Sequence, residues 1–330
     1  MISFVLKNLK IKYLLMKLFR SIKLNSTEKL TLTYILISGI IAIFLEFRAE
    51  NVSHLIFNRL IITGIILLMA FTENIITNVY LQLFRFLFIG FLLIYWYPET
   101  FEFNRLLENR DYLLALADQK MFGFQPSVLF KIKYPQHWFS ELMNMGYFAF
   151  YPILVVSCLY FYFKDQKYAR FFFFTCMFAF LSYYFIFIFF PTCGPQYYFP
   201  VIGSDNVTAG VFPHIANYFQ YHPYRLEDET STGLFRDAVV LVHNLFERPT
   251  GAFPSSHVGN TTLVMIMIIA KREYKFAALL SPIYIILVLS TIYIQAHYVI
   301  DIFAGFITAY LFYRLSIVIY PLFSKVTNKL

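Results

Sequence analysis

Residues 171–190 read FFFFTCMFAFLSYYFIFIFF and contain no charged side chain. A helix needs about 20 predominantly apolar residues to cross the hydrocarbon core of a bilayer. A water-soluble protein would have to bury such a helix on every side. The stretch therefore predicts a transmembrane helix, which continues to about Pro191.

The rest of the chain repeats this pattern. Of its 330 residues, 59% are hydrophobic and 21% aromatic, and the mean hydropathy is +0.62, whereas ordinary soluble domains are about 45–50% apolar. We therefore expect an all-α integral membrane protein with about eight transmembrane helices, in which Arg59 and Arg85 snorkel toward the membrane surface. The other apolar runs of spanning length are residues 31–47, 55–72, 79–97, 142–163, 257–270, 276–296 and 297–320.

The predicted helices divide the chain into three parts. Residues 1–29 form a basic segment with lysines and one arginine threaded through apolar positions, which is typical of a helix lying on an anionic membrane surface. A disordered basic tail is the alternative. Residues 30–75 hold two accessory transmembrane helices, and residues 76–330 hold a six-helix core with the motifs described below.

Lysines and arginines also gather in two short loops between apolar runs, at residues 164–170 and 271–275. Cytoplasmic loops carry such an excess. With an even number of spans, the N- and C-termini are then cytoplasmic as well. The long segments 98–141 and 192–254 fall on the periplasmic or luminal side of a plasma membrane or equivalent endomembrane.

The net charge of +8 does not indicate nucleic-acid binding. The basic residues lie beside apolar runs, and they form no stripe interleaved with stacking aromatics. The three cysteines, Cys158, Cys176 and Cys193, have neither the spacing of a disulfide framework nor that of a metal site. We expect no nucleic-acid partner, no metal and no cofactor, and the sequence does not predict an oligomeric state.

A first polar motif, GAFPSSHVGN, occupies residues 251–260 at the start of an apolar run. Ser255 is placed to cap a helix, and the free N–H groups and dipole of a helix start favour an anion such as phosphate. Ser255 and Ser256 are candidate phosphate donors, a role compatible with capping. His257 follows as a candidate proton donor; alone, it is equally typical of a hydrogen-bonding residue at a helix start.

A second motif, STIYIQAHYVID, occupies residues 290–301. His297 and Asp301 are four residues apart, so on a helix they share one face. A carboxylate at membrane depth needs a partner, and an imidazole N–H would fix the histidine tautomer and raise its basicity, as a nucleophile requires. Interhelical hydrogen bonding is the alternative role for Asp301. Two spans separate His257 from His297, so both arrive at one membrane face.

The two motifs resemble the type 2 phosphatidic acid phosphatase superfamily, which pairs Pro-Ser-x-His with a later His-x-x-x-Asp. The resemblance covers about residues 80–320. Within it, several stretches are similar to the branch of inositol phosphorylceramide synthases: residues 118–126, 191–195 and 251–255, and the Thr291-x-Tyr293 that precedes His297.

This resemblance implies a metal-independent reaction in two steps. His297 attacks phosphorus to give a phosphohistidine, Asp301 orients it, and His257 protonates the departing oxygen. The partners would be a membrane phospholipid donor with a headgroup such as phosphoinositol and a ceramide- or diacylglycerol-like alcohol acceptor, or water.

The chain departs from the superfamily at its phosphate-binding cations. The phosphatases carry an arginine where this chain has Thr291, and their Lys-x6-Arg-Pro motif has no full match here. Thr291 therefore favours the transferase branch. We expect Arg248 to supply a phosphate cation, although a solvated loop arginine is the alternative, and Gln196 to donate a neutral hydrogen bond.

Two other functions remain open on the sequence alone. A lipid phosphate or polyprenyl diphosphate phosphatase would use the same histidines with water as acceptor. A non-catalytic lipid transporter or assembly subunit would keep the helices without the chemistry. The transporter is disfavoured because it has no need of both histidine motifs on one face, and because matched broken helices in two halves are not evident.

Overall fold

The computed structural model describes residues 23–46, 53–75, 79–225 and 232–324 of the chain. Throughout these ranges the chain is helical or forms turns and loops, without a β-strand. This confirms the all-α fold class. The predicted interfacial helix lies mostly at residues 1–22, outside the described residues, and stays a prediction.

The chain forms two compact units. The first holds α2 (Ser26–Glu46), α3 (Ser53–Ile75), the part of α4 (Val79–Asn104) up to Leu92, and the last turn of the final helix from Leu322. The second runs from Leu93 to Pro321 and contains every candidate site residue.

Two arginines are buried in the first unit, and each has partners there. Arg85 is 4% exposed and pairs with Glu28 at 2.5 Å and with Glu73. Arg59 is 3% exposed and donates to the hydroxyl of Ser38 at 3.0 Å. Because a buried charge is tolerated only with such partners, the expectation that Arg59 and Arg85 snorkel outward is wrong.

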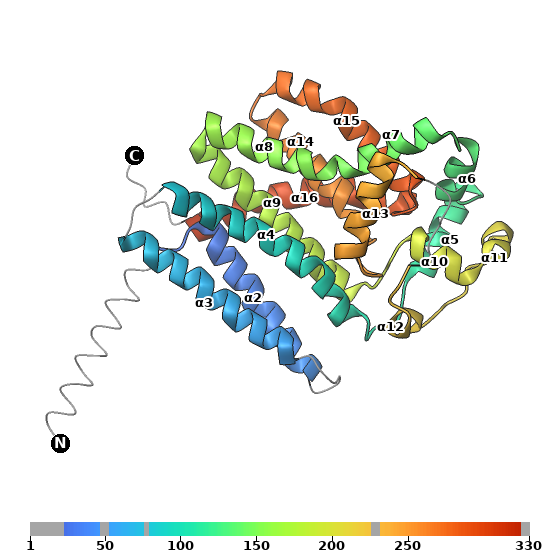
Figure 1. The fold of residues 1–330 in the computed structure, drawn as a ribbon, viewed down its shortest axis with the longest axis horizontal. Coiled ribbons are helices and arrows are strands. Elements are labelled where there is room, and N and C mark those ends of the chain that lie inside the picture. Colours follow the sequence, from blue (N-terminus) through green and yellow to red (C-terminus); the bar gives the residue numbers. More distant parts are fainter. Residues whose placement is uncertain (1–22, 47–52, 76–78, 226–231, 325–330) are drawn as a thin grey trace, which may run out of the picture. The chain divides into compact units, whose positions relative to one another are not determined.

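The second unit combines long apolar helices with shorter ones gathered at one end of them (Figure 1). The long helices are α8 (Phe150–Lys164), α9 (Gln166–Phe189), α14 (Ser256–Ala270), α15 (Tyr274–Tyr293) and α16 (Val299–Ser324). The shorter ones are α5 (Asp111–Phe122), α6 (Pro126–Lys133), α7 (His137–Phe148), α10 (Pro195–Ile202), α11 (Ser204–Ala209), α12 (Tyr218–Tyr221) and α13 (Leu234–Phe246).

Six of the described helices are long and apolar enough to cross a membrane: α2, α3, α4, α9, α15 and α16. Helices α7 and α8 meet at Ala149 with a bend of 42° and would add a seventh span if they act as one. Helix α14 is apolar but shorter. The predicted count of eight spans stays a prediction.

The two basic loops lie against each other in the second unit. Lys271 donates to Asp165 at 2.7 Å, and Lys164 donates to Glu273 at 2.6 Å. Both loops therefore occupy the same end of the long helices, away from the short helices (Figure 1). This is the arrangement expected of two loops on one membrane side, while the side itself stays a prediction.

Helices α14 and α16 approach closely where both carry glycine. A Cβ added to Gly305 would lie 2.9 Å from the carbonyl oxygen of Ser255 and 3.4 Å from the nitrogen of Gly259. Small residues allow such helix contacts in membrane proteins. The contact joins the two motifs, because the N–H of Ser255 donates to the carbonyl oxygen of Asp301 at 3.1 Å.

Candidate active site

The two predicted histidines meet in the second unit. His257 lies in the first turn of α14, and His297 lies in the loop immediately before α16. Their ring centroids are 5.9 Å apart, with an interplanar angle of 61°. The structure thus brings together two residues that are forty positions apart in the sequence.

A main-chain carbonyl defines the tautomer of His297. Its Nδ1 lies 2.8 Å from the carbonyl oxygen of Ala252. A carbonyl oxygen only accepts hydrogen bonds, so Nδ1 carries the proton and Nε2 keeps a free lone pair. The carboxylate of Asp301 lies farther from Nδ1, at 3.4 Å. The expected carboxylate–imidazole contact is therefore shared with a closer partner that the sequence did not indicate.

Asp301 is fully buried at the start of α16. Its Oδ2 accepts a hydrogen bond from the N–H of Tyr298 at 2.9 Å, while its Oδ1 has no hydrogen-bond partner. The carboxylate thus caps the helix start and faces His297 with the same oxygen. The sequence predicted that His297 and Asp301 share one face of a helix. In the structure His297 instead lies before the helix begins.

Aromatic rings hold His257. Its imidazole stacks on Tyr147 at a centroid distance of 4.5 Å and packs against Phe150 at 4.3 Å. Within the described residues no hydrogen bond to either of its ring nitrogens is present. The ring is therefore positioned by packing, and its nitrogens remain available for proton transfer.

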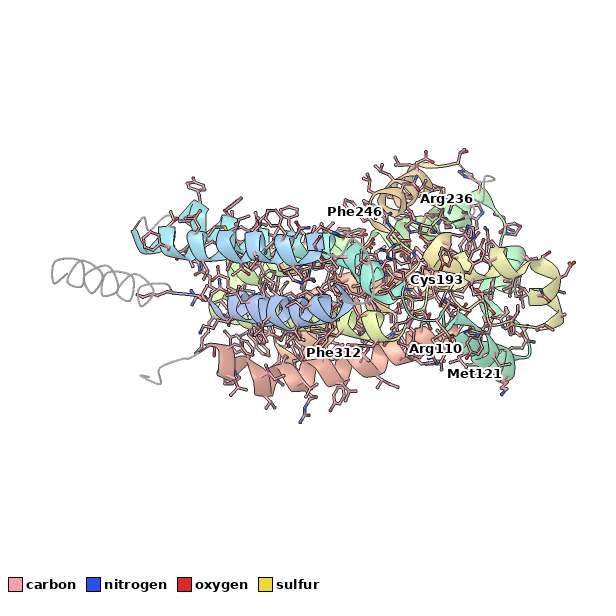
Figure 2. All side chains as sticks on the ribbon, turned by 90° about the horizontal axis from the view of Figure 1, so that it is seen from below. Arg110, Met121, Cys193, Arg236, Phe246 and Phe312 are labelled. Carbon is pink, nitrogen blue, oxygen red and sulfur yellow. The ribbon has the colours of Figure 1, made fainter. Side chains whose placement is uncertain are left out.

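Helix α5 ends at Gly123, which adopts a left-handed conformation. Its first residue, Asp111, accepts hydrogen bonds from the N–H groups of Cys193 and Gly194, both at 2.8 Å, and from the hydroxyl of Tyr298 at 3.1 Å. Burial raises the pKa of Asp111 although these hydrogen bonds oppose it. Cys193 itself lies in the interior (Figure 2).

A second carboxylate of α5 reaches the same region. Asp118 accepts hydrogen bonds from the N–H groups of Val299 and Ile300, at 2.8 and 3.1 Å. These groups open α16 and have no partner within the helix. Asp118 therefore fixes the chain directly after His297.

The loop around Gly194 also touches the histidine loop. Gly194 has a φ of 84°, and a Cβ there would overlap the carbonyl oxygen of Ala296. The N–H of the following Gln196 donates to the carbonyl oxygen of Gln295 at 2.8 Å. Glycine is required here because a side chain would separate the two loops.

His257 and His297 both line a cavity with about 270 Å³ of empty space, part of it solvent. We name it the histidine cavity; its lining consists of Tyr97, Tyr147, Cys193, Gln196, Tyr197, Glu247, Thr250, Gly251, Ala252, His257, Ala296 and His297. None of these lining residues is a lysine or an arginine.

The predicted phosphate-binding residues differ in position. Gln196 lines the cavity, whereas Ser255, Ser256 and Arg248 do not. Ser255 is the N-cap of α14, as predicted, and its hydroxyl accepts from the N–H of Val258 at 3.3 Å. Arg248 is exposed and donates to a main-chain oxygen of its neighbour at 2.8 Å. No contact of these three residues tests a phosphate-binding role.

Sequence reasoning missed a polar cluster beside the cavity. The carboxylate of Glu247 lies 3.0 Å from Nε2 of His243 and accepts from Tyr147 and Gln196, both at 3.3 Å. Arg225 donates to Nδ1 of His243 at 2.8 Å and to Gln196 at 3.2 Å. The i,i+4 spacing of His243 and Glu247 was the only signal in the sequence, and it is common on helices.

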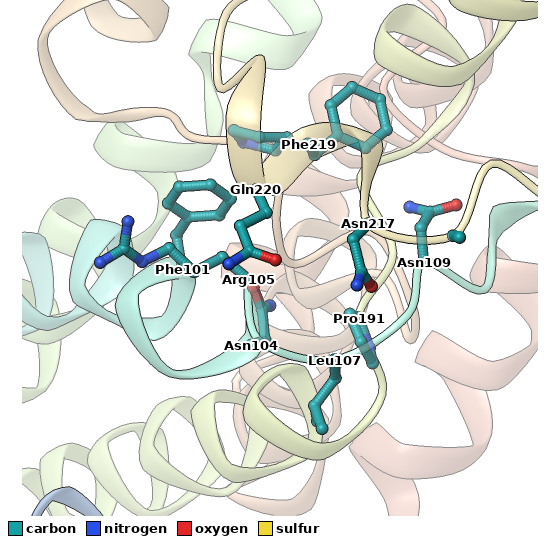
Figure 3. A pocket seen from close by; sticks show the side chains of 11 residues that line it. Phe101, Asn104, Arg105, Leu107, Asn109, Pro191, Asn217, Phe219 and Gln220 are labelled. Atoms are coloured by element: carbon teal, nitrogen blue, oxygen red, sulfur yellow. The ribbon is translucent and has the colours of Figure 1, made fainter. Parts of the chain in front are cut away.

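Figure 3 shows a separate hollow, which has about 250 Å³ of empty space, part of it solvent. Its lining includes Phe101, Arg105, Asn217 and Gln220, and none of the predicted site residues. The two hollows share a wall, because Asn104, which lines this second hollow, donates to the hydroxyl of Thr250 at 2.6 Å.

Comparison with known proteins agrees with this geometry. The family profile of the PAP2 superfamily matches residues 113–315, more than half of the chain. The match includes both histidine motifs and most of α5. No curated protein and no solved structure matches the chain. The chain therefore belongs to the PAP2 superfamily, as its two histidine motifs predicted.

Proposed function

We propose that the protein is a membrane lipid phosphotransferase that works through a phosphohistidine on His297. PAP2 membership supports phosphatase or phosphotransferase chemistry. The observation that carries the proposal is the free lone pair on Nε2 of His297, in the same cavity as the unpaired ring nitrogens of His257. A nucleophile and a proton carrier in one cavity are what two-step transfer requires.

In the first step, Nε2 of His297 attacks the phosphorus of a phospholipid, and the bond from phosphorus to the leaving oxygen breaks. His257, in its protonated form, gives its proton to that oxygen. The ring of His297 gains positive charge, which the carbonyl of Ala252 and the carboxylate of Asp301 stabilise at Nδ1. Asp301 thus orients the nucleophile without carrying a proton.

In the second step, neutral His257 takes the proton of an acceptor hydroxyl, and the acceptor oxygen attacks phosphorus. The bond between phosphorus and Nε2 breaks, and both histidines return to their starting forms. A ceramide- or diacylglycerol-like alcohol gives a new phospholipid, whereas water gives hydrolysis. Neither step of this mechanism employs a metal ion.

Position 291 supports transfer over simple hydrolysis. Thr291 stands where the superfamily's phosphatases carry an arginine, and it is fully buried with its hydroxyl donating to the carbonyl oxygen of Val288 at 2.8 Å. Phosphoryl transfer depends on stabilising negative charge at the equatorial oxygens. Without that arginine, a donor of lower charge is favoured, such as a phospholipid with a phosphoinositol headgroup.

The test is to trap the intermediate. Purified protein is incubated with phosphatidylinositol labelled on phosphorus, with ceramide, or diacylglycerol whose acyl chains differ from those of the donor, added in a second reaction. We expect acid-labile label on the wild-type protein and on the control His222→Ala, whose side chain is exposed, but none on His297→Ala.

The products separate the candidate functions. A new labelled phospholipid supports transfer. Free phosphate or a released phosphoalcohol without a new phospholipid would identify a hydrolase and reject the transferase. Full activity in both His257→Ala and His297→Ala would reject a catalytic role for these histidines. Absence of any labelled product with the wild-type protein would favour the transporter.

A further inference from the structure

Glu247 is an acidic side chain in the histidine cavity that the mechanism above does not use. Its side chain is 9% exposed, and its two oxygens contact His243, Tyr147 and Gln196. A carboxylate is unexpected in the lining of a cavity proposed to hold phosphate, because the two negative groups repel each other. Its presence therefore calls for a role other than binding the phosphoryl oxygens.

The surroundings of Glu247 favour its ionised form. Arg225 can only donate, so Nδ1 of His243 accepts, and the remaining ring proton sits on Nε2, 3.0 Å from the Glu247 carboxylate. Burial alone would raise the pKa of Glu247, but His243 outweighs it, with help from His257 and Arg225, and the pKa falls to about 2. Glu247 is thus a fixed negative charge and a hydrogen-bond acceptor.

A fixed negative charge distinguishes phosphate esters by their charge. A phosphomonoester carries about 1.5 to 2 negative charges near pH 7, whereas a phosphodiester carries one. No lysine or arginine among the described lining residues offsets the additional charge. Arg225 contacts Gln196 and His243 and is not part of the lining.

The same carboxylate offers a place for hydroxyl groups. Two carboxylate oxygens have about four acceptor positions, and Glu247 uses two of them for hydrogen bonds from Tyr147 and Gln196 while His243 lies beside a third. A headgroup alcohol that enters the cavity finds a free acceptor position next to the amide of Gln196. Hydroxyl-rich headgroups therefore gain a contact where a second phosphate charge is repelled.

We propose that Glu247 is a specificity-determining residue, which selects singly charged phosphodiester headgroups that bear hydroxyls and rejects phosphomonoesters. This inference rests on the phosphotransferase function proposed above. Glu247 would thus set which lipid donor is preferred, and the two histidine motifs alone do not predict that preference.

The test compares two donors in mixed detergent micelles, phosphatidylinositol as the diester and phosphatidic acid as the monoester. Glu247→Gln keeps the side-chain shape and removes the charge. A neighbouring unit charge in a partly water-excluded site changes affinity by roughly tenfold to a hundredfold. We expect the ratio of kcat/KM for phosphatidic acid to that for phosphatidylinositol to rise at least tenfold, and Glu247→Asp to keep the wild-type ratio.

A second variant covers the case in which Glu247→Gln does not fold. Gln196→Lys leaves Glu247 in place and adds a cation to the same lining, so it should move the ratio in the same direction. An unchanged ratio in the folded variants, or a wild-type preference for phosphatidic acid, would overturn the role of Glu247 while phosphohistidine still forms. Absence of phosphohistidine with both donors would instead reject the proposed function.

Discussion

The contact between α14 and α16 can be tested at Gly305. In Gly305→Ala, the new Cβ would lie 2.9 Å from the carbonyl oxygen of Ser255, closer than real Cβ atoms come to a neighbour, and ordinary contact begins near 3.4 Å. The two helices must therefore separate by about half an ångström, and overpacking of this kind destabilises by about 1–3 kcal/mol. His257 and His297, one on each side of the contact, would move apart with them.

We expect a larger effect on catalysis than on folding. A misplacement of about 1 Å lowers a reaction rate by roughly a hundredfold, so half of that predicts a loss of roughly tenfold in transfer rate. Thermal unfolding in detergent micelles and the transfer assay measure the two effects on the same sample.

A matched control is Gly64→Ala in α3, where a Cβ meets nothing within 4 Å. Alanine is the better helix former by about 1 kcal/mol, so this variant should be at least as stable as wild type and fully active. If Gly305→Ala behaves like Gly64→Ala in both measurements, the close helix contact does not position the histidines and the reasoning fails.

Further predictions concern the proposed acid His257, the helix cap Asp118, the buried carboxylate Glu247 and the membrane topology. His257→Ala should lower the transfer rate by roughly a hundredfold to ten-thousandfold with little change in thermal stability, and equal losses of both would argue against proton transfer. Asp118→Asn, which weakens the cap of α16, should lower the free energy of unfolding by about 1 kcal/mol in denaturant titrations; no change would contradict the capping role. The lowered pKa of Glu247 contributes stability that is present above its ordinary value of 4.5 and lost as pH falls toward 2, so wild type should lose about 3 kcal/mol more than Glu247→Gln across that range. In intact cells, a membrane-impermeant maleimide should label Asp205→Cys but not Lys167→Cys before lysis, and the reverse pattern would invert the predicted topology.

The sequence predicted the parts of the site that depend on local chemistry. Ser255 caps α14, as its sequence position predicted, because a hydroxyl before an apolar run favours that role in any helix. The two predicted spans between His257 and His297 place both residues on one membrane face, but that argument does not by itself predict that their rings meet.

Contacts between distant segments could not be predicted in this way. Arg225 and Glu247 both contact His243, although Arg225 is 18 positions away from it in the sequence, and no residue pattern encodes that contact. Arg59 and Arg85 resemble snorkelling residues in the sequence, and only the packing of the first unit shows their partners. The sequence also could not reveal the partner of His297, because a peptide carbonyl occurs at every position.

Because this partner is a main-chain carbonyl, the tautomer of His297, the proposed nucleophile, does not depend on a side-chain acceptor at position 252. A substitution of Ala252 keeps the main-chain oxygen that accepts the Nδ1 proton, so the tautomer of His297 need not change. What the enzyme must preserve is the path of the backbone through Gly251 and Ala252. Substitutions that bend the backbone at residues 251–252 should therefore impair His297, even when they change no titratable side chain.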